Sequence, residues 1–357
     1  MGRRQRQVFA IIRTIHAWSG AALSLLLAIL GLSGTLLVFR DDWLRTIFAP
    51  ARDGLIPEPA NLAVVADAAE TAFGDRLLSA VFGTPDMGLT RLYLTDGDAA
   101  WLDPDGAVLA QWSGNARPEA WLFDLHHHLL AGHTGEIVSG IAGLAAVALT
   151  VTGLVALWPA RRAIGLKVWP GSSQRGALLS AHRNLGLMTA LPLLVLSLTG
   201  AAMIFPGSAK ALLSGFRPAP AVQARVIDAT YSDPDWNAVF TAAQDRAPDA
   251  VIRIVRWPNP DNPAISLRLR QPAEWHPNGR TYVLADPATA QATLSADAQT
   301  QPTATRLYNA LYPVHSAHLG RGLPGRLYDL ICALTGLALT TLGLIGVWAF
   351  LRHRILR

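Results

Sequence analysis

Cysteine and charged residues are both scarce in this 357-residue chain. It has one cysteine, Cys332, and only 15% of its residues are charged. A single thiol excludes an internal disulfide framework, a cysteine-based zinc site and the Cys-x-x-Cys-His attachment of covalent haem. Soluble domains usually carry about 25% charged residues, and disordered chains contain few apolar ones. With 51% hydrophobic residues, the sequence argues against both a cytosolic enzyme and a disordered protein.

Charge is absent from four long apolar runs, 14–39, 137–160, 184–209 and 330–351. Each reaches the ~20 residues that an α-helix needs to cross a bilayer. Tryptophans stand at or near the ends of these runs, as interfacial anchors do: Trp18, Trp43, Trp158 and Trp348. A soluble helical bundle rarely has four such runs. The first one exceeds the apolar core of about 7–15 residues in a signal peptide, so we expect an uncleaved anchor.

Acidic residues are missing from three segments, 1–14, 161–183 and 352–357, which together hold 12 Lys and Arg. The other 18 Lys and Arg and all 25 acidic residues lie in 40–136 and 208–329. The positive-inside rule therefore places both termini and the 161–183 loop in the cytoplasm. The net charge of +5 records this topology, and no nucleic-acid partner is expected.

The chain repeats itself in two halves. Without a gap, His16, Gly20, Leu32-Ser33-Gly34 and Phe39 align with His182, Gly186, Leu198-Thr199-Gly200 and Phe205. The second and fourth runs align through Thr150, Gly153 and Trp158 with Thr340, Gly343 and Trp348. Each half also has an outer helix, 61–73 or 235–246, before strand-like segments, which are 77–82, 89–95 and 99–112 in one half and 250–256, 264–270 and 280–285 in the other. We expect a mainly α membrane protein with four transmembrane helices from a tandem duplication and two small α+β outer domains.

These expectations divide the chain into eight segments. They are the cytoplasmic N-terminus and first span (1–40), the first outer domain (41–120), an outer histidine segment with the second span (121–160), a cytoplasmic loop (161–181), the third span (182–206), the second outer domain (207–311), an outer histidine segment with the fourth span (312–351) and a cytoplasmic tail (352–357).

Histidines stand at equivalent places of the two halves. His16 and His182 begin the first and third spans on the cytoplasmic side, and we call them the inner pair. His126 and His315 precede the second and fourth spans on the outer side, and we call them the outer pair. Ionisable side chains near the membrane interior are costly and usually functional. Two imidazoles from opposite sides are what a b-type haem iron needs, although a lone histidine at a helix end is often an interface residue.

Small and basic residues accompany the inner pair. Gly20 and Gly186 lie four residues after their histidines, on the same helix face, where they leave space for a flat macrocycle; close helix packing is the other interpretation of these glycines. Arg13 and Arg183 flank the pair and are candidates to hold haem propionates.

Further histidines surround the outer pair, namely His127, His128, His133 and His318. Such a cluster also allows a mononuclear copper or zinc site. A continuous helix would lift His126 about 18 Å above residue 138. We therefore expect helix breaks at Gly132-His-Thr-Gly135 and Gly320–Gly325, while His276 is expected at the surface.

Together these motifs resemble the PepSY-associated transmembrane family, bacterial inner-membrane proteins often linked to iron uptake. The resemblance covers nearly the whole chain. It rests on Ile15-His-Ala-Trp-Ser-Gly20, on Leu125-His126 with Leu129-Leu130 and Gly132-x-Thr-Gly135, on Ala181-His-Arg-Asn-Leu-Gly186, on Tyr312-Pro-Val-His315-Ser with Gly322-Leu-Pro-Gly-Arg326, and on Trp101-Leu-Asp-Pro-Asp-Gly106, which is similar to the strand–turn–strand of a PepSY module.

The resemblance implies a four-helix core with two haem b groups and PepSY-like periplasmic domains, similar to siderophore-iron reductases. It assigns His16 and His182 to the inner haem and His126 and His315 to the outer one. The implied activity passes electrons outward to a ferric siderophore bound between the outer domains. Extra histidines at 127, 128, 133 and 318 depart from the family pattern and leave the outer ligands open.

An electron donor must come from elsewhere, because the chain has no P-loop and no cytoplasmic segment long enough for a flavin domain. The donor is expected to be a separate protein, a small reductant or a quinol. Another class of function stays open: a haem-free membrane protein whose outer domains bind a siderophore or regulate a peptidase.

Overall fold

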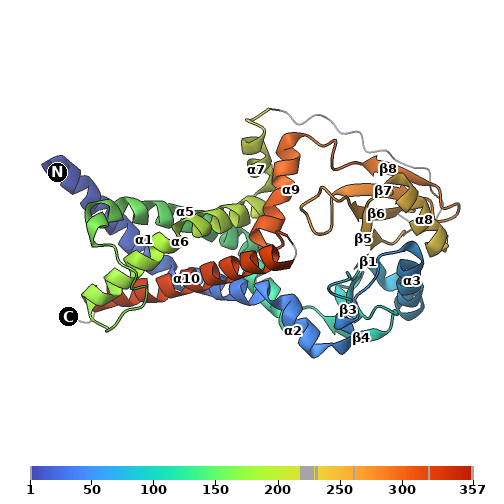
Figure 1. Cartoon of the computed structure of the whole chain (residues 1–357), viewed down its shortest axis with the longest axis horizontal. Coiled ribbons are helices and arrows are strands. Elements are labelled where there is room, and N and C mark those ends of the chain that lie inside the picture. Colours follow the sequence, from blue (N-terminus) through green and yellow to red (C-terminus); the bar gives the residue numbers. More distant parts are fainter. Residues whose placement is uncertain (1, 218–228, 230–231, 260–261, 321, 355–357) are drawn as a thin grey trace. The chain divides into compact units, whose positions relative to one another are not determined.

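The computed structural model describes residues 2–217, 229, 232–259, 262–320 and 322–354 (Figure 1). The chain forms two compact units. One comprises Met1–Phe39, Trp121–Ala209 and Val314–Arg357, and we call it the membrane unit. The other comprises Arg40–Ala120 and Lys210–Pro313, and we call it the sheet unit.

Four long helices build the membrane unit: α1 (Arg3–Val38), α5 (Gly132–Leu157), α6 (Arg175–Ile204) and α10 (Gly322–Arg354). All four are long and apolar enough to cross a membrane. Large apolar side chains such as Leu25, Leu191 and Leu334 are exposed along them, as in helices that face lipid. The four expected spans are therefore confirmed as helices.

The third expected span ends earlier than its charge-free run. Helix α6 stops at Ile204, and Pro206 opens a separate helix, α7 (Pro206–Leu213). Proline has no backbone N–H and its ring collides with the preceding turn, so it begins a helix more readily than it continues one.

Small residues allow the long helices to approach closely. Helix α1 packs against α10 and α5, and α6 packs against the same two helices. A Cβ added to Gly31 of α1 would lie 2.5 Å from the carbonyl oxygen of Gly336 of α10. At this crossing Thr340 donates a 3.1 Å hydrogen bond to the carbonyl of Ala28. Backbone contact of this kind holds helices together where lipid removes the hydrophobic driving force.

Two short helices lead into α5 and α10. Helix α4 (Pro118–His128) meets α5 through Leu129, Leu130 and Gly132, which have φ of 51°, 59° and 56°. Helix α9 (Thr303–His315) meets α10 through Ala317, Gly320 and Gly322, with φ of 58°, 85° and 63°. Left-handed residues end a helix and reverse the chain. The expected breaks are thus confirmed, although Gly135 itself lies within α5.

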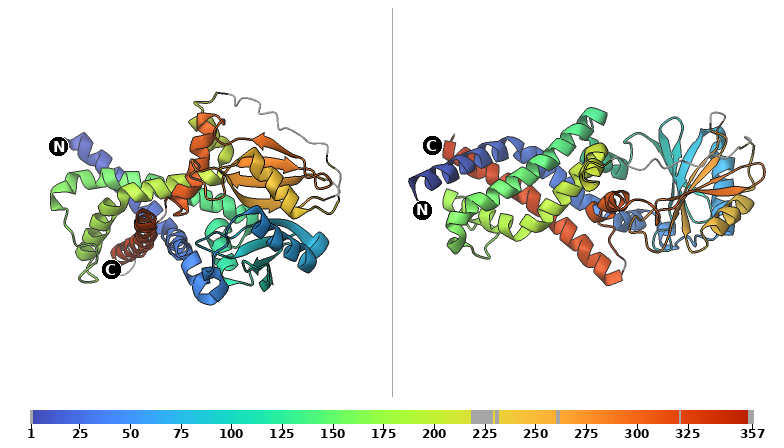
Figure 2. Two further views of the ribbon diagram at one scale, coloured as in Figure 1. Left: turned by 45° about the vertical axis from the view of Figure 1, so that its right-hand side comes forward. Right: turned by 90° about the horizontal axis from the view of Figure 1, so that it is seen from above.

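The sheet unit contains eight antiparallel strands in the order β4-β3-β2-β1-β5-β6-β7-β8 (Figure 2). They are β1 (Leu77–Val81), β2 (Thr90–Leu94), β3 (Asp98–Leu102), β4 (Val108–Ser113), β5 (Val251–Arg256), β6 (Ile265–Arg270), β7 (Thr281–Ala285) and β8 (Ala292–Ala296). Seven of them fall in the segments predicted to be strands, and β8 was not predicted.

A single sheet replaces the two separate outer domains that the sequence predicts. Strand β1 of the first half pairs with β5 of the second, with Ser79 opposite Arg256 and Val81 opposite Ile254. Direct pairing leaves no room for a ligand between these two strands. Strands β1 and β5 are the edge strands of the two four-stranded halves. An edge strand presents unpaired backbone N–H and C=O groups, and pairing β1 with β5 satisfies them.

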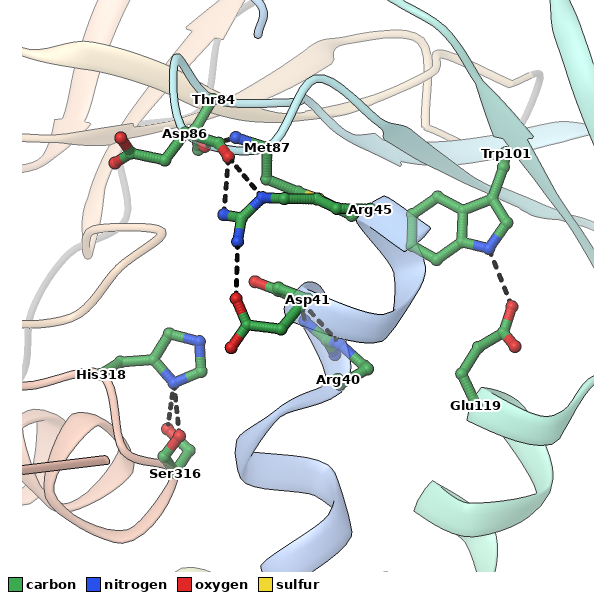
Figure 3. Close-up of polar contacts among 11 residues, drawn as sticks. Arg40, Asp41, Arg45, Thr84, Asp86, Met87, Trp101, Glu119, Ser316 and His318 are labelled. Atoms are coloured by element: carbon green, nitrogen blue, oxygen red, sulfur yellow. Dashed lines mark hydrogen bonds and ion pairs between the residues drawn. The ribbon is translucent and has the colours of Figure 1, made fainter. Parts of the chain in front are cut away.

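Helices α3 (Pro59–Phe73) and α8 (Trp236–Arg246) pack against the sheet and form one hydrophobic core with it. Leu62 and Val65 of α3 and Val239 and Phe240 of α8 are fully buried there. Helix α2 (Arg40–Ile47) belongs to the same unit, and its Arg45 donates to the carbonyl of Asp86 (Figure 3). Short 3-10 helices complete the elements: η1 (Ala49–Arg52), η2 (Gly74–Arg76) and η3 (Trp158–Ala163).

Candidate functional site

Both histidine pairs that the sequence predicts come together in the membrane unit. The rings of His16 on α1 and His182 on α6 have centroids 6.2 Å apart. The rings of His126 on α4 and His315 on α9 have centroids 6.1 Å apart. A transition-metal ion holds an imidazole nitrogen at about 2 Å, so two imidazoles on opposite sides of one ion have centroids roughly 6 Å apart. The spacing of both pairs fits one metal ion between the rings.

A glycine of a neighbouring helix lies beneath each of the four rings. A Cβ added to Gly153 of α5 would lie 3.1 Å from Cε1 of His16, and one added to Gly346 of α10 would lie 3.4 Å from Cε1 of His182. Such an added Cβ on Gly34 of α1 would lie 3.0 Å from His126, and on Gly200 of α6 it would lie 2.6 Å from His315. The missing side chains make the pockets in which the imidazoles lie.

Three of the rings are anchored through Nδ1 by a hydroxyl group that directly precedes the pocket glycine. Ser33 Oγ lies 3.0 Å from His126 Nδ1, Thr152 Oγ1 lies 3.2 Å from His16 Nδ1, and Thr199 Oγ1 lies 3.5 Å from His315 Nδ1. His315 Nδ1 also lies 2.9 Å from the carbonyl oxygen of Leu196.

These contacts determine which ring nitrogen carries the hydrogen. Each hydroxyl donates its only hydrogen at 2.7 Å to a carbonyl one turn earlier, those of Ile29, Ala148 and Val195. The hydroxyl oxygens are therefore left to accept from the imidazoles, as the Leu196 carbonyl also must. With Nδ1–H donating, Nε2 keeps its lone pair, which is the arrangement of a metal-ligating histidine with an outer hydrogen-bond partner.

The outer pair is neutral in the folded protein. Burial lowers the pKa of His126 to about 3, with a smaller effect from His315 and His127. Burial also lowers the pKa of His315, against the opposing effect of its hydrogen bond to the Leu196 carbonyl. Both residues lie on short helices outside the four membrane-spanning ones. Only the neutral imidazole offers a lone pair to a metal ion, so their environment favours the ligating form.

The glycine contacts revise the alignment of the two halves. Gly20 faces Leu149 and Gly186 faces Leu342, each at 3.7 Å from an added Cβ. Gly153 therefore corresponds to Gly346, and its sequence-based alignment with Gly343 is wrong by three residues. A shift of three residues nearly preserves the face of a helix that turns every 3.6 residues, which is why the two alignments look alike.

The residues expected around the inner pair have different surroundings. Gly20 and Gly186 have room for a Cβ, so tight helix packing does not explain them. Arg183 donates hydrogen bonds to Asn184 at 3.3 Å and to Ser180 at 3.2 Å on its own helix. Arg13 is exposed on α1, one turn before His16. Both arginines remain close in sequence to the pair, and the two glycines face leucine side chains and not the histidine rings.

The remaining outer histidines do not join the outer pair. His127 and His128 contact each other at 2.9 Å, and His128 pairs with Asp124 at 2.7 Å. The exposed His133 lies 3.1 Å from Glu136. His318 turns its Nδ1 to Ser316 in the corner between α9 and α10 (Figure 3). Among the described residues no three ligating side chains come together as a metal site, which does not favour the copper or zinc interpretation.

His276 belongs to the sheet unit and is buried, so its expected position at the surface is wrong. Its ring stacks on Tyr312 with centroids 4.7 Å apart, and the Arg268 guanidinium lies 3.1 Å from its Nδ1. His276 is buried because its ring lies between the Tyr312 ring and the Arg268 side chain of β6.

The four pocket glycines and their hydroxyl neighbours are site residues that sequence reasoning missed. A signal for two of them was present, because Ser33-Gly34 and Thr199-Gly200 align between the halves.

The family comparison covers the same stretch of chain as the four helices and both histidine pairs. The family model of the PepSY-associated TM region matches residues 13–353. No curated protein matches the sequence. The chain is a member of the PepSY-associated transmembrane family.

Proposed function

We propose that this protein is a bacterial inner-membrane oxidoreductase that holds two haem b groups and passes electrons across the membrane to reduce a ferric siderophore on the periplasmic side. The observation that carries the proposal is the pair of neighbouring imidazoles at each site. Their centroids lie 6.2 and 6.1 Å apart, and three of the four Nδ1 atoms are hydrogen-bonded so that Nε2 keeps its lone pair.

The two sites lie near opposite ends of the same helices. Gly34, which forms the pocket of His126, follows His16 on α1 by 18 residues, and Gly200 follows His182 on α6 by the same number. At 1.5 Å per residue this spacing is about 27 Å, close to the ~30 Å hydrocarbon thickness of a bilayer. One site near each membrane surface is what transmembrane electron transfer requires.

This chain's own residues would orient and insulate the two groups. The pocket glycines let the imidazoles lie against a neighbouring helix, and the hydroxyl groups fix the ring planes. Gly20 and Gly186 lie one turn from the inner histidines, each facing a leucine of a neighbouring helix at van der Waals distance, and Arg13 and Arg183 are candidates to bind the propionates of the inner group. When bound, each haem supplies a one-electron Fe(III)/Fe(II) couple.

Ferric siderophore fits as the substrate because reduction loosens it. Siderophores bind hard Fe(III) through oxygen atoms, and the softer Fe(II) is held less well by such ligands. Electrons would enter at the inner site from a separate cytoplasmic protein, a small reductant or a membrane quinol. In this proposal the twelve basic residues of 1–14, 161–183 and 352–357 mark the cytoplasmic side.

The absorption spectrum of the purified protein tests the proposal. We expect a Soret band and split α and β bands after dithionite, with two haems for each chain. His16→Ala should lose the inner haem and keep the outer one. His133→Ala is the matched control, because its side chain is exposed and it lies outside both pairs. Purified wild type without a Soret band would favour the haem-free alternative, in which the protein binds a siderophore or regulates a peptidase.

Substrate reduction is measured separately from haem content. Dithionite-reduced protein, freed of excess reductant, should be reoxidised when a ferric siderophore is added, and a gallium siderophore should leave it reduced. Haem that stays reduced with every ferric siderophore tested would contradict the assigned substrate but not the cofactor. Metal without porphyrin in elemental analysis would instead indicate a copper or zinc site.

A further inference from the structure

The inner pair is asymmetric in a way that the outer pair is not. His16 Nδ1 is anchored by the Thr152 hydroxyl, whereas no hydroxyl among the described residues reaches the buried Nδ1 of His182, which has only the backbone carbonyl of Leu342 beside it. Both outer histidines are anchored, His126 by Ser33 and His315 by Leu196 and Thr199. One of four otherwise equivalent imidazoles therefore lacks a hydroxyl partner.

The cause of this asymmetry lies at a single sequence position. Ser33, Thr152 and Thr199 each directly precede a pocket glycine, and the residue in that place before Gly346 is Ile345. Gly153 and Gly346 lie at similar distances from their rings, with an added Cβ 3.7 Å and 3.6 Å from the Nδ1 atoms of His16 and His182. A hydroxyl at 345 would thus be in reach of His182, and isoleucine has none.

Apolar side chains occupy the place where a hydroxyl would reach His182, and they leave the Leu342 carbonyl as its neighbour. Ile345 is 7% exposed and packs in one cluster with Leu178, Ala181 and Ala349. Leu178 and Ala181 lie on α6 within one turn of His182. Inside a membrane no bulk water replaces the missing hydroxyl.

An outer hydrogen bond changes how strongly an imidazole donates to its metal. Donation of Nδ1–H to an oxygen makes the ring more basic and fixes its orientation. A more basic axial ligand stabilises Fe(III) over Fe(II) and lowers the reduction potential, and hydrogen bonding around a haem is one of the protein's means of setting that potential. Without a hydroxyl acceptor, His182 is the weaker donor of the four.

We propose that Ile345 sets the potential of the inner site, because it withholds a hydroxyl from His182 and keeps the inner couple at a higher potential than a symmetric site would have. This inference rests on the proposed function. A higher inner potential eases the first step of the path, which is electron entry from the donor. Ile345 acts through His182 and is a positioning residue, not a ligand.

Redox titration of the full-length holoprotein tests the inference. Ile345→Thr introduces the missing hydroxyl, and Ile345→Val is its control because valine has the shape of threonine without the oxygen. We expect Ile345→Thr to lower one of the two midpoint potentials, with the other haem unchanged as an internal reference. Ile345→Val should leave both potentials in place. Thr152→Val removes the hydroxyl beside His16 and should raise the same midpoint that Ile345→Thr lowers.

The possible outcomes distinguish a wrong role for Ile345 from a wrong haem assignment. If wild type contains two haems and Ile345→Thr shifts neither midpoint, or Ile345→Val shifts one equally, the role of Ile345 is wrong while the haem assignment stands. If Ile345→Thr does not fold, an unshifted potential in Thr152→Val contradicts the inference by itself. Wild-type protein without haem overturns both.

Discussion

At the scale of single residues, the site depends on glycines, which have no side chain. Four glycines make room for four imidazoles, and the closest of these contacts is between Gly200 and His315. A glycine in a membrane helix is usually explained by helix packing, as Gly31 and Gly336 are here. The pocket glycines have a different purpose, because the nearest atoms to their added Cβ belong to histidine rings.

Gly200→Ala should displace His315 and remove the outer haem. Its Cβ would lie 2.6 Å from Cε1 of the ring, a distance that forces the imidazole away from its partner. Gly176→Ala, in the same helix, is the control because an added Cβ there meets nothing within 4 Å. Pyridine haemochrome assay of the purified variants should give one haem in Gly200→Ala and two in Gly176→Ala. Two haems in both variants would contradict the pocket assignment.

The sequence predicts the histidines well but not their pockets. His16, His182, His126 and His315 stand out because an ionisable group near a membrane is costly and these four occur at equivalent places. Gly153 and Gly346 do not, since glycine is common in membrane helices and a register shift of three residues nearly preserves a helix face. The absence of a hydroxyl at Ile345 is visible only after the register has been corrected.

At the scale of elements, the corners before α5 and α10 place the outer pair. Leu129 and Leu130 adopt left-handed conformations that cost about 1–2 kcal/mol each, so the surrounding packing must stabilise the turn. Gly135 permits that packing, since an added Cβ would overlap the carbonyl of His128. The α4–α5 corner, and with it His126, depends on this contact.

Gly135→Ala should open the α4–α5 corner. Overpacking of this kind typically costs about 1–3 kcal/mol, and we expect a lower Tm in detergent together with loss of the outer haem only. Gly132→Ala is the control that distinguishes backbone strain from a steric clash. The φ of 56° at this position is unfavourable for alanine, but an added Cβ would meet no atom within 4 Å. That variant should lose about 1 kcal/mol and keep both haems. Equal haem loss in the two variants would show that backbone strain, not the His128 contact, positions the helix.

Element types were largely predictable, whereas strand pairing between the halves was not. The apolar runs, the Gly-rich breaks and the alternating strands are local patterns. Pairing of β1 with β5 joins Ser79 to Arg256 across a long separation in sequence. No periodicity in either strand encodes that contact, because edge pairing depends on backbone groups that every strand presents. The eight-stranded sheet is therefore a finding of the structure.

At the scale of the whole molecule, the distribution of charge is more informative than its sum. Twelve basic residues without an acid occupy 1–14, 161–183 and 352–357, and all 25 acidic residues lie elsewhere. This separation predicts the direction of electron flow, because it assigns the inner pair to the cytoplasmic side. If the orientation were reversed, the histidine pairs would exchange roles and the sheet unit would face the electron donor.

Scarcity of cysteine makes this orientation directly measurable. Cys332 is 4% exposed within α10, so a membrane-impermeant maleimide should leave the wild-type protein unlabelled. Asp105→Cys, in an exposed turn between β3 and β4, should be labelled in cells whose inner membrane is intact. Ser172→Cys, in the exposed 161–183 loop, should be labelled only after that membrane is permeabilised. Labelling of Ser172→Cys before Asp105→Cys would reverse the topology and the proposed path of the electrons, while both histidine pairs would keep their geometry.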